Sequence, residues 1–298
     1  MFEGTIKRLQ DWYSSADKRM LFSVSLVLLI ASCGFLYYNM GRTRGAKEEG
    51  EWFLKGLTLR GGNQLTAEIP VDLEVDVRKV EDLFAEEGIE SRVRAARSAT
   101  ERRVEVRTGT DTTEEKILEV LGKEGIEVKD HSFNTVDPAL AEGFWEQSRL
   151  ALIAAFFFMG IVVLFVFRDF VPFVAILYAV TMDMIVVITM MQVFQIPLTL
   201  ASFAGLLLVI GYSVDSDVVL VTRILKRREG TVTERAFSAM KTNMAMMLTT
   251  LSALVVLYLT TTAKALREIA AVLIIALLID FVSTWFGNAS VIRWWVER

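Results

Sequence analysis

Six long apolar stretches dominate this sequence and limit what it can fold into. Each has roughly the 20 residues that an α-helix needs to cross the hydrocarbon core of a bilayer. They cover residues 20–38, 149–167, 171–193, 198–222, 244–262 and 266–286. Of the 298 residues, 53% are hydrophobic, which is more than a soluble domain usually carries. We therefore predict an α-helical membrane protein with six transmembrane helices.

Basic residues in the short connections predict how these helices are oriented. Lys and Arg are frequent before the first stretch, between the fourth and fifth, and after the sixth. The connection around Gln195 and Pro197 carries no charge, and it is the short cytoplasmic loops that are enriched in Lys and Arg. We expect a multi-pass protein of the cell membrane with both termini in the cytoplasm. The first stretch is expected to stay as a helix, because no small-residue cleavage site follows it.

The polar segment between the first two stretches has the pattern of a small α+β domain. Residues 63–69 alternate as a strand does, and the amphipathic helix that follows ends at Gly88. Two strands, a second helix ending at Gly125 and a last strand come next. The order β-α-β-β-α-β is that of a ferredoxin-like sandwich. We expect three parts, namely 1–40 with the first helix, this external domain at 41–148, and a five-helix transmembrane bundle at 149–298.

Composition excludes several kinds of site. The chain has one cysteine, Cys33, and one histidine, His131, which leaves no disulfide framework, zinc cluster or histidine-based catalytic triad. The formal net charge of −4 argues against nucleic-acid binding. The external domain has no nucleophile–base pair and no phosphate loop. We expect no enzymatic activity, no metal and no cofactor.

Four aspartates interrupt the apolar stretches: Asp183, Asp215, Asp217 and Asp280. Each costs about 2.5–3.5 kcal/mol on insertion scales if it stands alone at the bilayer centre, so such groups usually face a bundle interior or a water-filled path. We predict a proton relay, in which these acids take up and release protons as the helices move. The alternative is that they are neutral packing groups of the bundle.

Helical geometry favours Asp215 as the main acid of the relay. At about 100° per residue it shares an arc of small residues with Gly205 and Gly211, and such arcs let helices approach closely. Asp217 lies on the far side of the helix, which makes it the weaker candidate. Asp280, at a similar depth, is expected to meet Asp215 in one polar layer. Polar support is expected from hydroxyl groups and one counter-charge, namely Ser213, Ser216, Thr249, Thr250 and Lys241.

One segment near the start of the external domain is similar to a known family. "KGLTLRGGNQL" resembles the glycine-rich opening of the external domain in the SecF family, with Gly56, Gly61 and Gly62 in place. Thr58 stands where that family usually has an acid. SecF is the smaller partner in the SecD–SecF complex of the protein-export channel and belongs to the resistance-nodulation-division (RND) superfamily.

The fourth apolar stretch carries a second resemblance to the same family. Its end, "GYSVDSDVVLVTRI", is similar to the fourth-span motif of SecF. Ser216 replaces the usual acid of that motif, whereas the SecD form of the motif places its acid at Asp215. The departure from the common SecF form is typical of the archaeal branch. The six spans and the single external domain resemble SecF over nearly the whole chain.

The resemblance implies a function in protein export. A family member would assist the passage of preproteins across the membrane together with SecD and the Sec translocon channel. It would contact membrane lipid and the emerging preprotein, and its RND-type bundle would couple this work to the proton gradient. Two alternatives remain, an RND-type half-transporter for a lipid or small molecule and a non-conducting scaffold of the export channel.

Overall fold

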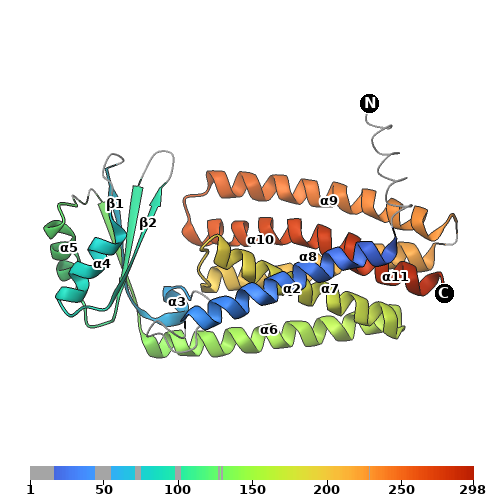
Figure 1. Ribbon diagram of the computed structural model, residues 1–298, viewed down its shortest axis with the longest axis horizontal. Helices are drawn as coiled ribbons and strands as arrows, with labels where there is room; N and C mark the ends of the chain where they lie inside the picture. Colours follow the sequence, from blue (N-terminus) through green and yellow to red (C-terminus); the bar gives the residue numbers. More distant parts are fainter. Residues whose placement is uncertain are drawn as a thin grey trace. The chain divides into compact units, whose positions relative to one another are not determined.

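The computed structural model describes residues 17–43, 55–70, 75–97, 102–126, 128, 130–227 and 229–298. Residues 1–16 of the predicted first part are therefore outside the described residues. The chain divides into two compact units, which are taken separately below. The α+β unit is Lys55–Arg149, and the helical unit is the rest of the described chain. Figure 1 shows the elements of both units along the chain.

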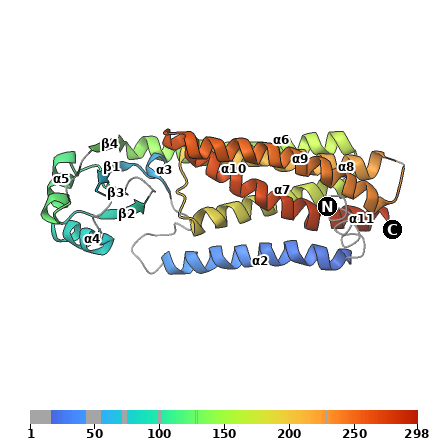
Figure 2. The ribbon, with the colours of Figure 1, turned by 90° about the horizontal axis from the view of Figure 1, so that it is seen from above.

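The α+β unit contains a four-stranded sheet and two main helices. Its elements are α3 (Leu57–Arg60), β1 (Gly62–Ile69), α4 (Val77–Glu86), β2 (Ser91–Arg97), β3 (Arg102–Thr108), α5 (Glu114–Lys123) and β4 (Asp130–Val136). The strands lie in the order β2-β3-β1-β4, and all neighbours are antiparallel. Figure 2 shows α4 and α5 beside these strands. The predicted ferredoxin-like arrangement is confirmed.

One apolar core joins the sheet to both helices. Side chains of a strand alternate between its two faces, so every second residue of β1 and β3 points to the helices. The fully buried strand residues are Leu65, Ala67, Val104 and Val106. Phe84 of α4 and Leu121 of α5 are also 0% exposed and belong to the same cluster. The alternation that predicts the strands thus builds the core.

Both main helices of the α+β unit end at a glycine with φ +73°, Gly88 after α4 and Gly125 after α5. The isoleucine that follows each glycine donates its backbone N–H to a carbonyl of the last turn, at 2.8 and 3.2 Å respectively. This is a Schellman ending, in which a residue with a Cβ would be strained. The sequences "EEGI" and "KEGI" therefore close two helices in the same way.

The α+β unit opens with a tight turn at Gly61 and Gly62. Their φ angles are +79° and +101°. A Cβ on Gly61 would lie 2.7 Å from the Cα of Pro138, and one on Gly62 would lie 2.6 Å from the carbonyl oxygen of Thr108. Only glycine fits at either position. Gly56, the third glycine of this segment, has an ordinary φ of −79° and precedes α3.

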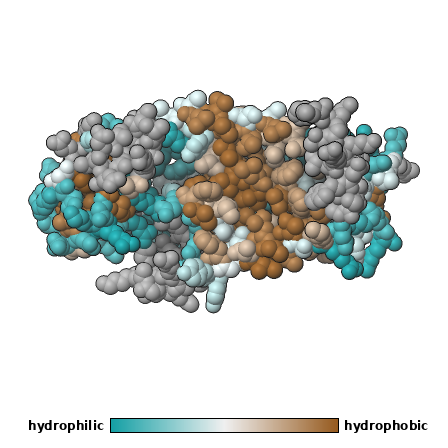
Figure 3. All heavy atoms as spheres, turned by 45° about the horizontal axis from the view of Figure 1, so that its top comes forward, coloured by the Kyte–Doolittle hydropathy of each residue, from teal (hydrophilic) through white to brown (hydrophobic). Residues whose placement is uncertain are grey.

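In the described part of the chain, six helices are long and apolar enough to cross a membrane, as predicted. They are α2 (Lys18–Thr43), α6 (Pro138–Phe167), α7 (Phe170–Val193), α8 (Leu200–Lys226), α9 (Val232–Thr260), and a last helix made of α10 (Lys264–Val282), η1 (Ser283–Asn288) and α11 (Ala289–Val296). Figure 3 shows apolar side chains gathered over the surface of the helical unit, as contact with lipid requires.

Three helix boundaries differ clearly from the predicted ones. Helix α6 begins at Pro138 rather than near residue 149. Helix α9 begins at Val232 rather than near residue 244, because the amphipathic segment before the apolar run is helical too. A capping box starts it, in which the side chains of Thr231 and Glu234 each accept a hydrogen bond from the other residue's backbone N–H. The last helix continues past residue 286 through the six-residue π-helix η1.

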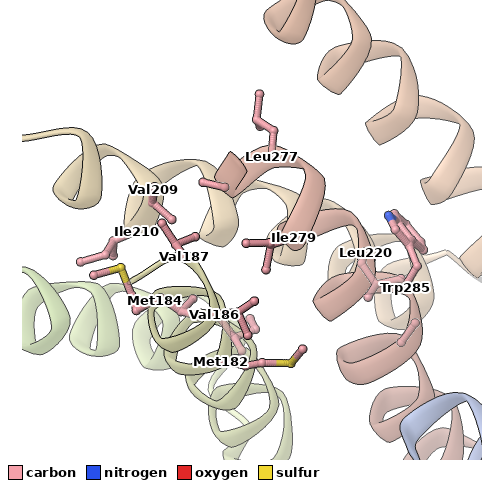
Figure 4. Packing of buried hydrophobic residues seen from close by; sticks show 14 of the residues in the cluster. Met182, Met184, Val186, Val187, Val209, Ile210, Leu220, Leu277, Ile279 and Trp285 are labelled. Carbon is pink, nitrogen blue, oxygen red and sulfur yellow. The ribbon is translucent and has the colours of Figure 1, made fainter. Parts of the chain in front are cut away.

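The centre of the helical unit is formed by α7, α8 and α10. Helix α8 packs most extensively against α10, and both contact α7. Figure 4 shows Met184 and Val187 of α7 close to Val209 and Ile210 of α8. Trp285, in the last helix, is 1% exposed. Large apolar side chains therefore fill this centre on either side of the polar groups described next.

Candidate functional site

Three of the four membrane aspartates meet in the centre of the helical unit. Asp183 of α7 and Asp217 of α8 are 0% exposed, and Asp280 of α10 is 3% exposed. Asp280 interacts electrostatically with both of the others. We call these three residues the carboxyl cluster. Within the described residues, no ion pair reaches any of them.

Serine hydroxyls of α8 contact the carboxyl cluster. Ser213 Oγ donates a hydrogen bond to Asp183 Oδ2 at 2.5 Å, while Asp183 Oδ1 is buried without a hydrogen-bond partner. Ser216 lies beside Asp280, and its Oγ donates to Oδ1 of Asn243 in α9 at 3.2 Å. Both serines that were predicted to support the acids therefore lie at the carboxyl cluster.

A threonine of the last helix bridges two of the acids. Thr284 Oγ1 lies 3.1 Å from Asp217 Oδ1 and 3.2 Å from Asp280 Oδ1. Asn288 donates its Nδ2 to the same Asp217 oxygen at 2.7 Å. In an α-helix, residues four apart drift by about 40° around the axis, because a turn takes about 3.6 residues. A π-helix takes more residues per turn, so η1 reverses this drift and keeps Asn288 on the face of Asp280.

The geometry around Thr284 favours a proton in the cluster. A threonine hydroxyl has one hydrogen to donate and lone pairs that accept. When it donates to one carboxyl group, a hydrogen bond to the other exists only if that second group carries a proton. Burying three ionised carboxylates without a cation would also cost roughly several kcal/mol of desolvation free energy for each of them. We infer that the cluster holds at least one proton in this conformation.

The position of Asp215 contradicts the prediction made for it. Asp215 is on the exposed face of α8, and Asp217 occupies the buried position. Two residues apart on an α-helix differ by about 200°, so only one of them can face the centre. The buried face is the one with larger apolar side chains, Leu206 and Ile210, which join the core of the helical unit. The layer expected between Asp215 and Asp280 is therefore formed by Asp217 instead.

The two glycines predicted to mediate helix packing have different surroundings. Gly205 is buried against α10, where a Cβ would lie 3.2 Å from the Cβ of Val272. Gly211 is exposed, and nothing lies within 4 Å of the position of a Cβ. Within the described residues, Gly211 therefore packs against no other helix of this chain, and its predicted role in helix packing stays a prediction.

The polar residues predicted on α9 lie away from the acids. Lys241 is exposed, and its ammonium group lies 5.3 Å from the ring centroid of Phe237. It forms no ion pair with any residue that the structure describes, so it does not act here as the counter-charge that was expected for the aspartates. Thr249 is exposed and donates to carbonyls of its own helix, and Thr250 is half-buried.

Two buried asparagines at the site were not predicted from the sequence, namely Asn243 and Asn288, which are 3% and 0% exposed. Asn288 stands two turns after Asp280 in the sequence, which is a spacing that indicates a shared helix face. It falls beyond residue 286, where the sixth span was expected to end. The signal was therefore present and lay outside the predicted helix.

Comparisons with known sequences point to one family. The family model described as "Protein export membrane protein SecD/SecF, C-terminal" matches residues 116–298. The protein-export membrane protein SecF of Methanothermobacter thermautotrophicus is 39% identical over 249 residues, which cover 82% of this chain and 84% of that protein. The SecF of Pyrococcus furiosus is 33% identical over 282 residues, which cover 94% and 89% of the two chains.

Solved structures of SecDF have a similar fold. The crystal structure of SecDF from Thermus thermophilus, a translocon-associated membrane protein, matches with a TM-score of 0.70 at 22% identity. A SecDF structure in the super-membrane-facing form matches with a TM-score of 0.54 at 20% identity. Each match covers 94% of this chain and 38% of the solved chain. This chain thus corresponds to well under half of those longer proteins.

Proposed function

The chain belongs to the SecF family of protein-export membrane proteins, and from this premise we propose that it moves protons through the carboxyl cluster while it is bound to a SecD-type partner. Membership in the family makes it an accessory membrane subunit of Sec-dependent export, and favours this function over a half-transporter for lipids. The proton step rests on one observation, the burial of three carboxyl groups midway along membrane helices. Such groups mark ion and proton paths in membrane proteins.

The membrane potential supplies enough energy for such coupling. One elementary charge that crosses 100 mV releases about 2.3 kcal/mol. A few protons per cycle would therefore drive a rearrangement of several kcal/mol in the helices or in the α+β unit. In this proposal the basic connection between α8 and α9 is cytoplasmic, and the α+β unit is outside the cell, where it meets emerging preprotein.

The outward face of α8 supports a partner within the membrane. Between Leu200 and Asp215 its exposed residues form one stripe, namely Leu200, Ala204, Leu208, Gly211, Tyr212 and Asp215. An aspartate that faces acyl chains costs about 2.5–3.5 kcal/mol, and a second protein over Asp215 would remove this penalty. Small residues in the stripe allow close helix contact. The matched SecDF chains extend well beyond the part that this chain covers, which supports a SecD-type protein as the covering partner.

Proton flux across proteoliposomes tests the relay. Asp217→Asn and Asp280→Asn, each reconstituted with the SecD-type partner, are expected to abolish proton movement driven by an imposed gradient. Each substitution keeps the size of the side chain. The complex with the SecD-type partner should still assemble, because the amide still forms hydrogen bonds. Asp82→Asn, at an exposed position of α4, is the matched control and keeps wild-type flux. Normal flux in both cluster variants would refute the relay and leave the scaffold function.

Copurification tests the partner surface. Gly211→Leu places a large side chain in the exposed stripe of α8 and is expected to reduce the amount of SecD-type partner that copurifies. Gly34→Leu is the matched control, because Gly34 of α2 is also exposed and has no atom within 4 Å of the position of a Cβ. Equal recovery of the partner with both variants would exclude this face of α8 as the interface.

A further inference from the structure

We propose that the hydroxyl group of Thr284 passes the proton between Asp280 and Asp217, and that Asn288 positions Asp217 for this step. The inference rests on the proton pathway proposed above and assigns one transfer inside it. It concerns a threonine and an asparagine that are both 0% exposed and both belong to the π-helix η1.

The distances around Thr284 favour transfer through its oxygen. The chain of atoms runs from Asp280 Oδ1 to Thr284 Oγ1 over 3.2 Å, and from there to Asp217 Oδ1 over 3.1 Å. Within the described residues, no direct hydrogen bond joins the two carboxyl groups. A hydroxyl group is both a donor and an acceptor, so it can receive one proton while it releases another. Among the residues that the structure describes, Thr284 is therefore the one side chain in hydrogen-bonding contact with both acids.

The step balances without a co-reactant. With the proton on Asp280, its O–H donates to Thr284 Oγ1 while the Thr284 O–H donates to the Asp217 carboxylate. In the transfer, the O–H bond of Asp280 breaks as a new O–H bond forms on Thr284. The original Thr284 O–H bond breaks as a bond forms on Asp217 Oδ1. Asp280 becomes a carboxylate, Asp217 becomes a neutral acid, and Thr284 is neutral before and after.

Asn288 fixes the acceptor of this transfer. Its Nδ2 donates to Asp217 Oδ1 at 2.7 Å, the same oxygen that Thr284 contacts. An oxygen held by two donors has little freedom to rotate away, so it stays aimed at the hydroxyl. Both donors come from η1, and π-helical segments inside α-helices are frequent at functional sites. The π-helix thus supplies the carrier and the positioning group from one helix face.

The third acid of the carboxyl cluster stands outside this step. Asp183 contacts the hydroxyl of Ser213, which belongs to α8, and its other oxygen has no hydrogen-bond partner. It interacts with Asp280 both by charge and through a side-chain hydrogen bond. We expect Asp183 to change how readily Asp280 gives up its proton, and Thr284 to determine where that proton goes.

The Thr284→Val variant tests the transfer. It keeps the shape of the side chain and removes the hydroxyl group, and we expect proton flux to fall by about 100-fold, the lower end of what positioned proton transfer contributes. Thr284→Ser keeps the hydroxyl and should retain most of the flux. Thr189→Val is the matched control, because Thr189 is 3% exposed and its hydroxyl donates only to the Ile185 carbonyl of its own helix, at 2.8 Å.

A second readout separates proton transfer from structural support. Infrared difference spectra report the carboxyl C=O bands as pH changes. In the wild type, the bands of Asp217 and Asp280 should change together; in Thr284→Val they should change independently. Asn288→Ala, which keeps Thr284, should shift the pH at which flux is half-maximal without abolishing the flux.

Each outcome decides between the two proposals. Wild-type flux in Thr284→Val, with loss of flux in Asp217→Asn, would overturn the threonine step and leave the relay intact. Wild-type flux in both Asp217→Asn and Asp280→Asn would overturn the relay and the step together. If Thr284→Val does not fold, the wild-type protein still provides a test in mixtures of H₂O and D₂O. Two protons in flight give a curved dependence of rate on deuterium fraction, and a linear dependence would overturn the inference.

Discussion

Replacing Gly205 by alanine should push α8 and α10 apart where Gly205 packs against Val272. The added methyl carbon would lie 3.2 Å from Val272 Cβ and 3.3 Å from its Cγ1. Nonbonded carbons are most stable at about 3.5–4.0 Å, so the helices must separate by a few tenths of an ångström. Overpacking of this kind costs about 1–3 kcal/mol, and the higher helix propensity of alanine returns about 1 kcal/mol. We expect a net destabilisation of up to about 2 kcal/mol.

Gly211 offers the same substitution on the same helix without the contact. A Cβ there meets nothing within 4 Å, so Gly211→Ala should leave the free energy of unfolding unchanged or raise it by up to about 1 kcal/mol. Val272→Ala should cost about 2 kcal/mol, since it removes two methyl groups and leaves a small cavity. In the double variant with Gly205→Ala the two effects should fall short of their sum by about 1 kcal/mol, because alanine at 205 partly refills the space.

Unfolding of the purified chain in detergent measures these differences. The midpoint of each variant is followed by tryptophan fluorescence, to which the buried Trp285 of the last helix contributes. Identical midpoints for Gly205→Ala and Gly211→Ala would refute the close approach of α8 and α10. So would strictly additive effects of Gly205→Ala and Val272→Ala.

The remaining predictions concern the α+β unit. A hydrogen bond from Lys123, together with its charge, lowers the pKa of Glu87 below the ordinary value of 4.5. This pair therefore stabilises the unit above that pH, and the contribution is lost as the pH falls further. Hydrogen exchange should show that acid weakens the unit less in Lys123→Met than in the wild type; parallel pH profiles would contradict this. Gly62→Ala should destabilise the unit by at least about 1–3 kcal/mol, because its Cβ would meet the Thr108 carbonyl in a left-handed conformation. Limited proteolysis should cleave it faster than Gly109→Ala, whose Cβ would meet nothing within 4 Å, and equal rates would count against the turn.

The fold was largely predictable because its signals are local. Six apolar runs identify six helices, and alternation in 63–69 identifies β1. Gly88 and Gly125 identify where two helices stop. The start of α9 was missed, because an amphipathic helix outside the membrane does not raise the apolar content that marks a span. Its Thr231–Glu234 capping box is the sequence signal for that start.

The sequence predicts which type of residue forms the site, but it does not predict which face of α8 is buried. That membrane aspartates are special follows from their cost in lipid, and Asp183 and Asp280 lie in the cluster. The choice between Asp215 and Asp217 depends on which face of α8 packs inside the chain, and both faces carry features of a packing surface. A helical wheel does not show which of these two faces is buried inside the chain. Asn288 was missed because it lies beyond residue 286, where the sixth span was expected to end, whereas the last helix continues through η1.

Helices α4 and α5 end in matching corners, the Schellman endings at Gly88 and Gly125. These corners have a consequence for how the α+β unit folds during synthesis. Each corner is closed by a hydrogen bond between residues only a few positions apart, so it depends on nothing downstream. A polypeptide that emerges gradually from the ribosome can therefore complete the first corner before the second has been synthesised. Damage to one corner should leave the other able to form.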